Sequence, residues 1–279
     1  MRRFAFITFF VCLAVMGLWL LNNYSHIHDF IGQYVENTDF ITLEARYTAQ
    51  QIMEANRKEL LADEQRSFED PELKFHPYLF MDVKYTDDAK KPRESAILWS
   101  LVDGEMVLNS DTWEKTHGFE DAINAHASRT DYKIINALAK KNGSMTLDQL
   151  ERELHLDREM LQPWIDSALQ KHLVIQRGNE LQLHLQNPKI MVAPQTKISQ
   201  WLVTKPYNHA QRVAAKYSTS QIKTNAKAAF GEDFTIRESH EVYLPVYSIE
   251  VLNPDGSILT TYWNALNGKR IHPKYIAQK

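Results

Sequence analysis

The longest uninterrupted apolar run of the chain lies at its N-terminus. Residues 4–21 contain no charged side chain, and a helix of that length spans about 27 Å, close to the ~30 Å hydrocarbon core of a bilayer. Arg2 and Arg3 precede the run, and the next Lys or Arg is Arg46. Because basic residues stay on the cytoplasmic side, this pattern predicts a signal anchor in the inner membrane, with residues 23–279 periplasmic. Cleavage of the run as a signal peptide stays open, although no small-residue site follows it.

The segment that follows, residues 23–70, is predicted to be a helical stalk. Asn37, Thr38 or Asp39 can cap its start, and Pro71 ends it. Apolar residues recur at loose helical spacing, namely Leu43, Tyr47, Ile52, Ala55 and Leu60. We expect this stripe to pack on the protein's own body. A partner helix in a dimer is the alternative, but the heptads are not sustained.

Alternating aromatic and β-branched residues then predict a small α+β region over residues 71–130. Strands are expected at 78–86, 95–103 and 105–109. Asp103 and Gly104 join the last two strands as a tight hairpin, because glycine adopts the positive φ that such a turn needs. A turn and a short helix close the region.

The helical period returns in residues 131–187. Helices are predicted from Tyr132, after a cap at Thr146 with Gln149 as the second half of a capping box, and after Asp157. The hairpin "LVIQRGNELQLHL" follows them. This order resembles a winged helix-turn-helix over residues 131–185. His155 and His172 stand where members of that family often carry glycine, and histidine tolerates the left-handed region better than most residues.

Residues 197–279 read as a helix followed by antiparallel strands. The helix over 220–230 ends at Gly231, and "NPDG" marks a hairpin between two strands. The pattern "PVYSIEVLNPDG" followed by "WNALNG" is similar to small periplasmic PepSY-like domains. That resemblance implies a binding or regulatory module, in which the contact surface would include Tyr243, Tyr247, Tyr262 and Trp263. Core packing is the competing interpretation of these aromatic residues.

Together these patterns predict an α+β fold: a transmembrane helix, a helical stalk, a small α+β region, a winged-helix-like domain and a C-terminal α+β domain. No repeat at a fixed period is found. The one cysteine, Cys12, lies in the apolar run, so no intrachain disulfide is possible. No cofactor motif is present, and neither a cofactor nor a metal site is predicted.

Charge argues against nucleic acid as a partner. The formal net charge of −3 is unevenly spread, with −10 over residues 22–130, +5 over residues 197–279 and a net +2 over the rest of the chain. The third helix of the winged-helix-like domain, which would read DNA, carries a net −1 over residues 157–171. Phosphate contacts supply most nucleic-acid affinity, so an acidic reading helix loses that contribution.

One cluster of polar residues suggests chemistry. His117, Glu120 and Asp121 place an imidazole and two carboxylates within a short segment, which is the kind of set that moves protons. The structural alternative is that Gly118 ends a turn, Phe119 anchors the core and the carboxylates favour the start of the next helix.

The sequence therefore favours a membrane-anchored, periplasm-facing protein without catalytic activity that binds or scaffolds other envelope proteins. One alternative is a membrane-tethered regulator that binds DNA through its winged helix. The other is an enzyme with a scattered site near His117. The oligomeric state is not indicated by any pattern.

Overall fold

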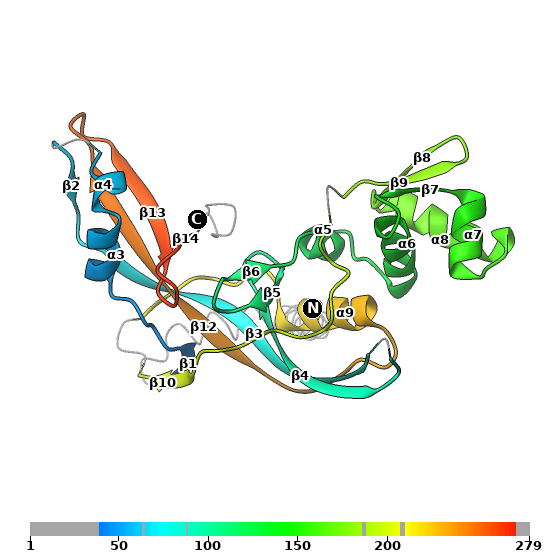
Figure 1. The fold of residues 1–279 in the computed structure, drawn as a ribbon, viewed down its shortest axis with the longest axis horizontal. Helices are drawn as coiled ribbons and strands as arrows, with labels where there is room; N and C mark the ends of the chain where they lie inside the picture. Colours follow the sequence, from blue (N-terminus) through cyan, green and yellow to red (C-terminus); the bar gives the residue numbers. More distant parts are fainter. Residues whose placement is uncertain (1–38, 63–64, 88, 186–187, 207–209, 272–279) are drawn as a thin grey trace, which may run out of the picture. The chain divides into compact units, whose positions relative to one another are not determined.

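The computed structural model describes residues 39–62, 65–87, 89–185, 188–206 and 210–271. The chain divides into two compact units. The first comprises residues 1–40 and 205–209, of which only residues 39, 40, 205 and 206 are described. The second comprises residues 41–204 and 210–279 and contains the features discussed below. It is a mixed α+β structure built on a large curled sheet (Figure 1).

The predicted membrane anchor needs correction. Among the described helices, none is both long and apolar enough to cross a membrane. Residues 4–21, on which that prediction depended, lie outside the described residues. The inner-membrane and periplasmic assignment that followed from the anchor is therefore unsupported.

The predicted helical stalk is also wrong where it can be seen. Residues 40–68 form two short helices between two strands, in the order β1 (Phe40–Leu43), α3 (Ala49–Ala55), α4 (Arg57–Leu60) and β2 (Ser67–Phe68). A capping box at Thr48 and Gln51 starts α3, and Asn56 ends it by donating its side-chain amide to the Ile52 carbonyl. Because local capping fixes both ends, the loosely spaced apolar residues do not continue as one helix.

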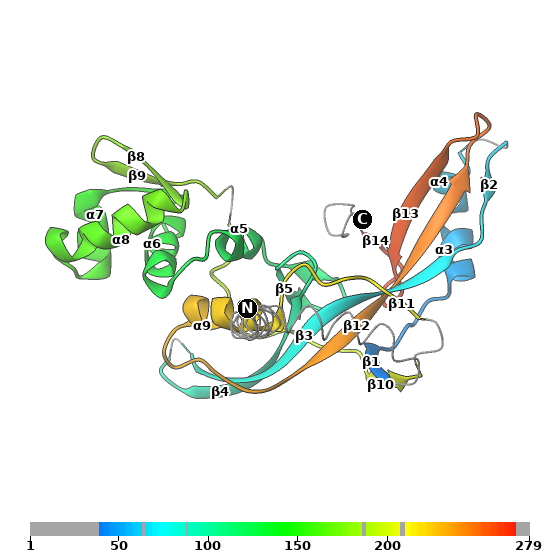
Figure 2. The same cartoon turned by 180° about the vertical axis from the view of Figure 1, so that it is seen from behind.

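Two long antiparallel strands form the centre of the sheet, β3 (Glu72–Thr86) and β12 (Thr235–Leu252) (Figure 2). The sheet runs in the order β10-β1-β12-β3-β4-β5-β6, with β11 on β3 and a β13–β14 hairpin on β12. The regions predicted as separate α+β domains thus share one sheet. The remaining strands are β4 (Pro92–Ser100), β5 (Met106–Asn109), β6 (Glu114–Lys115), β10 (Leu202–Lys205), β11 (Gln211–Arg212), β13 (Ile258–Asn264) and β14 (Arg270–Ile271).

The sheet contains an internal duplication. The sequence "RYTAQQI" at 46–52 corresponds to "KYSTSQI" at 216–222, and both segments begin a capped helix, α3 in the first case and α9 (Thr219–Phe230) in the second. Likewise "WSLVDGEMV" at 99–107 corresponds to "WNALNGKRI" at 263–271. We call residues 42–107 the first repeat and residues 212–271 the second repeat.

Backbone contacts confirm this equivalence and show that the repeats exchange their helices. The Tyr47 amide donates to the Ala265 carbonyl at 2.9 Å, and the equivalent Tyr217 amide donates to the Leu101 carbonyl at 2.9 Å. In the same way β1 of the first repeat pairs in parallel with β12 of the second, and β11 of the second with β3 of the first. Each repeat therefore packs its N-terminal elements on the sheet of the other.

Residues between the repeats form a helical insert with a small sheet of its own. It contains α6 (Arg129–Ala139), β7 (Ser144–Thr146), α7 (Leu147–Leu154), α8 (Arg158–Gln170), β8 (Val174–Arg177) and β9 (Glu180–Leu183), with sheet order β7-β9-β8. The predicted capping box at Thr146 is confirmed, and His155 and His172 have the positive φ of left-handed backbone. No finding tests the resemblance to winged helices, which stays a prediction.

The insert shares a core with the main sheet. One continuous cluster of buried apolar side chains includes Trp99 on β4, Phe119 on α5 (Phe119–Asn124), Tyr132 on α6 and Ile222 on α9. At its centre the Tyr132 hydroxyl donates to Asn225 Oδ1 at 2.7 Å. The insert is thus joined to the second repeat by buried contacts as well as by the chain.

Candidate functional site

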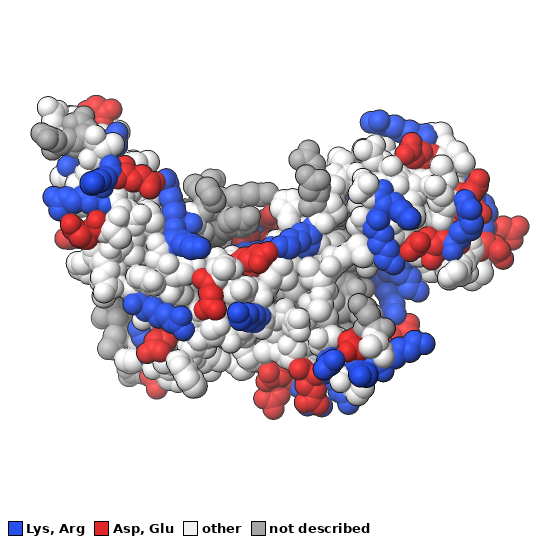
Figure 3. Space-filling view, viewed as in Figure 1, with Lys and Arg blue, Asp and Glu red and all other residues white. Residues whose placement is uncertain are grey.

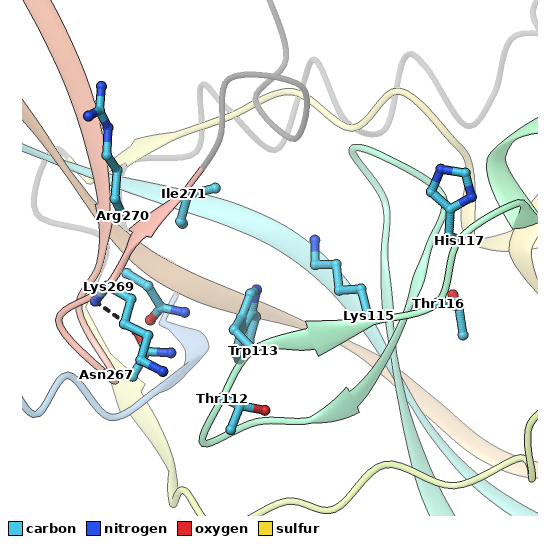
Figure 4. A pocket seen from close by; sticks show the side chains of 10 residues that line it. Thr112, Trp113, Lys115, Thr116, His117, Asn267, Lys269, Arg270 and Ile271 are labelled. Atoms are coloured by element: carbon cyan, nitrogen blue, oxygen red, sulfur yellow. Dashed lines mark hydrogen bonds between the residues drawn. The ribbon is translucent and has the colours of Figure 1, made fainter. Parts of the chain in front are cut away.

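A pocket of about 250 Å³ lies between β6, which follows the first repeat, and the turn and strand that end the second repeat. Figure 4 shows the segment from Thr112 to His117 along one side and Asn267 to Ile271 along the other. The lining residues are Thr112, Trp113, Lys115, Thr116, His117, Asn264, Asn267, Lys269, Arg270 and Ile271.

The pocket is cationic. Its described lining includes two lysines and one arginine but no Asp or Glu. Arg270 forms an ion pair with Glu59, 3.4 Å away, which does not line the pocket. Both side chains are exposed, so this pair contributes little to stability. Lys269 is exposed, and its backbone amide donates to Asn267 Oδ1 at 3.0 Å, which fixes the turn that presents it.

Two buried polar atoms at the pocket lack partners among the described residues. They are Nδ2 of Asn264 and Nδ1 of His117. Asn264 is 1% exposed, and its Oδ1 accepts from the Leu266 amide at 2.8 Å. This bond fixes Oδ1 toward the backbone and leaves the amide donor without an acceptor. A buried donor without an acceptor costs about 1–3 kcal/mol, so a bound acceptor would stabilise the site.

The hairpin that carries one side of the pocket is strained. Trp113 has φ of 56°, which is unusual for a bulky side chain. Its ring packs edge-on against Tyr78, with the two centroids 5.4 Å apart. Asp111 in the same turn accepts hydrogen bonds from Ser199 and Gln200, which tie the hairpin to the segment before β10. These contacts hold the left-handed residue in place, and such strain is typical of functional loops.

Lys115, which lines the pocket, is paired behind the lining with the buried Asp103. Lys115 Nζ lies 2.6 Å from Asp103 Oδ2, and the two side chains are only 8% and 3% exposed. Burial alone would lower the pKa of Lys115, but the Asp103 carboxylate and Tyr78 raise it above its ordinary value. Burial raises the pKa of Tyr78, which stays a neutral phenol. Lys115 is therefore a permanent cation held at a fixed position.

Glu105, two residues after Asp103, is buried and satisfied by the start of α5. It accepts hydrogen bonds from the Thr116 hydroxyl at 2.6 Å, the Gly118 amide at 2.8 Å and the Glu120 amide at 3.1 Å. Burial raises its pKa, and these three donors act in the opposite direction. Its role is to fix the segment that carries Thr116 and His117 along the pocket.

Comparison with known proteins finds no match. No family model, no curated protein and no solved structure is similar to the chain. The pocket must therefore be interpreted from its own chemistry.

The predicted site residues are only partly at this pocket. His117 lines it. Glu120 instead pairs with Lys216, 2.8 Å away, and accepts from the Tyr217 hydroxyl at 3.4 Å. Asp121 is exposed in the first turn of α5. The described residues contain no group of three or more His, Cys, Asp or Glu that would suit a metal ion.

The predicted aromatic contact residues do not form one exposed surface. Trp263 is buried and donates its indole N–H to Thr261 at 2.8 Å, while Tyr247 packs beside it. Tyr243 is also buried, under the guanidinium of Arg212 at 5.8 Å. Tyr262 packs on a different cluster. These placements favour the core-packing interpretation.

The helical insert lacks a basic reading helix. Arg158, at the start of α8, is engaged by Asp148 at 2.7 Å and by Glu151. Figure 3 shows Lys and Arg next to Asp and Glu over this part of the face in view. These pairings leave Arg158 with little free charge for a phosphate backbone.

The sequence missed Asn264, Lys269 and Lys115 as site residues. The available signal was the change from "DGE" at 103–105 to "NGK" at 267–269. This change of residues points to a site only once the structure shows that the two turns are equivalent.

We expect the stability of the protein to depend on pH through His76, whose pKa is affected by Lys115. Its side chain is buried, and burial together with Lys115 lowers its pKa to about 4. Between pH 6.5 and 4 the unfolded chain binds a proton that the folded protein does not, so the free energy of unfolding should fall as the pH is lowered. We expect His76 to account for a loss on the order of 3 kcal/mol, measured by urea denaturation at pH 7 and pH 4. His76→Gln should flatten this slope, and an unchanged slope would contradict the assignment.

Proposed function

We propose that this chain is a binding protein without catalytic activity, and that its pocket receives an anionic group of the ligand. The observation that carries the proposal is the unpartnered Asn264 amide, 1% exposed, in a pocket lined by Lys115 and Lys269 and by no carboxylate among the described residues. Buried donors require acceptors, and an anion accepts from several donors at once.

The size and polarity of the pocket narrow the ligand group. At about 250 Å³ the pocket lies just below the range of sites for drug-sized molecules. It suits a single carboxylate or phosphate with a short apolar portion beside Trp113 and Ile271. Hydrogen bonds from charged donors contribute more to affinity than those from neutral donors. Lys269 should therefore supply most of the affinity, and the side-chain amide of Asn264 should set the orientation of the bound group.

The contacts support binding more than catalysis. An acid–base site needs its imidazole and carboxylate within hydrogen-bonding distance of a common substrate. Glu120 is instead held by Lys216 and Tyr217, and Glu105 by Thr116 and two backbone amides. Among the described residues that line the pocket, none therefore supplies His117 with a carboxylate partner for acid–base catalysis.

The test uses glutarate and inorganic phosphate as probes, with glutaramide as the neutral counterpart. Titration of the full chain, followed by NMR of side-chain amides, should shift the Asn264 amide with either anion and not with glutaramide. Lys269→Glu should weaken binding of the anions by about tenfold or more, since one charge-assisted hydrogen bond is lost.

The matched control is Lys84→Glu, which makes the same change of net charge on an exposed lysine of β3 outside the pocket. We expect its effect to stay within about twofold and to vanish at high salt. Equal binding of glutaramide, or an equal loss in both lysine variants, would overturn the proposal.

A further inference from the structure

Because of the duplication, the pocket can be compared with the equivalent place in the first repeat, which β6 fills. In the first repeat β5 pairs with β4 on one edge and with β6 on the other, where Val107 lies opposite Lys115. In the second repeat β14 pairs with β13 in the same register, with Tyr262 opposite Ile271. Among the described residues no strand pairs with the other edge of β14. The pocket lies at this edge of β14, where the described part of the second repeat has no counterpart to β6.

The charges of the two turns differ: the first position loses its charge and the second reverses it. In the first repeat the turn presents Asp103 and Glu105, and the covering strand supplies Lys115 to the former and the Thr116 hydroxyl to the latter. In the second repeat the equivalent positions are Asn267 and Lys269. A strand that covered β14 in the same way would meet a lysine where Thr116 meets Glu105. It would therefore need a carboxylate at that point.

We propose that the ligand is an extended acidic segment of a partner polypeptide, which adds to β14 as a strand and places a Glu or Asp carboxylate on Lys269. The inference rests on the proposed function and names the ligand class. Strand addition supplies main-chain hydrogen bonds, and the pocket supplies the preference for an acidic side chain. Asn264 Nδ2 is the second donor for that carboxylate, because it is buried at the same pocket without an acceptor.

The probe is a capped seven-residue peptide of alternating valine and threonine with one central glutamate. Three relatives serve as comparisons: glutamine at the centre, lysine at the centre, and the glutamate peptide with N-methylated amides that cannot pair as a strand. Affinities for the full chain are measured by fluorescence anisotropy. The glutamate peptide should bind about tenfold or more tightly than the glutamine peptide, and N-methylation should cause a loss of similar size.

A charge exchange supplies the matched control. The Lys269→Glu variant should lose its affinity for the glutamate peptide and should instead bind the lysine peptide. The Lys84→Glu variant should keep the order of affinities of the unaltered protein. Hydrogen exchange of the β14 amides should slow on binding the glutamate peptide and stay unchanged with the N-methylated form.

The outcomes separate this inference from the proposed function. If glutarate binds but the peptides bind no better than glutarate and N-methylation has no effect, the strand inference is overturned and the anion pocket stands. If neither glutarate nor the glutamate peptide binds, both proposals fail. Retained preference for the glutamate peptide in Lys269→Glu would place the contact elsewhere and would also overturn the inference.

Discussion

Asp103→Ala should lower the free energy of unfolding by about 3–5 kcal/mol, because it leaves a buried ammonium group without its partner. Asp103 and Lys115 are 3% and 8% exposed, and their charged atoms lie 2.6 Å apart. The substitution also removes the acceptor of the Glu105 amide, which is 3.1 Å from Asp103 Oδ1. Urea denaturation followed by circular dichroism measures the change.

The duplication provides the control at the equivalent position. Asn267→Ala removes a side chain with two hydrogen bonds, to the Asp111 carbonyl and from the Lys269 amide, but leaves no charge unpaired. We expect a loss of about 1–2 kcal/mol there. The double variant Asp103→Leu with Lys115→Met should recover most of the loss, since it removes both charges. Equal losses in the two alanine variants would show that the buried pair is not the cause.

Local structure was largely predictable from the sequence. The capping box at Thr146, the helix end at Gly231 and the turns at Gly104 and Gly256 all occur as expected, and each glycine has positive φ. These features depend on a few consecutive residues, whose side chains and backbone freedom decide the conformation directly. The strand segments near 78–86 and 95–103 were located for the same reason.

Pairing between distant segments was not predictable. Alternation marks a strand but not its neighbour, so nothing in residues 71–130 indicated that β3 would pair with β12. The duplication was missed because the helical insert separates the repeats and because the two copies differ in length: Tyr47 and Trp99 are 52 residues apart, whereas the equivalent Tyr217 and Trp263 are 46 residues apart. A search for one repeat length does not detect two copies of unequal length.

The candidate site shows the same limit. Its two sides come from β6 and β14, which lie far apart in the chain, and only His117 among the predicted site residues lies there. The first repeat closes its turn with its own strand and buries Asp103 and Glu105. The second repeat keeps Lys269 exposed at an edge that no described strand covers. The two copies thus differ at this turn, which is covered by a strand in the first repeat and exposed among the described residues in the second.

Trp99→Ala is expected to destabilise the sheet and the helical insert together, by about 3–5 kcal/mol. The indole is 0% exposed and donates to the Gly104 carbonyl at 2.7 Å. Its ring lies 4.8 Å from that of Phe119, which in turn lies 6.2 Å from Tyr132 on α6. Because these side chains belong to one continuous core, a cavity at Trp99 should be felt in the insert.

Native-state hydrogen exchange distinguishes a shared core from an independent domain over residues 131–187. If the core is shared, the substitution lowers the free energy of opening by the same amount for the most protected amides of α6 and α8 as for those of β3 and β4. Trp99→Phe is the milder variant; it keeps most of the apolar volume, leaves the Gly104 carbonyl unpaired and should cost about 1–3 kcal/mol in both places. Unchanged protection of α6 and α8 in both variants would show that the insert folds by itself, and that its contact through Tyr132 and Asn225 contributes little to its stability.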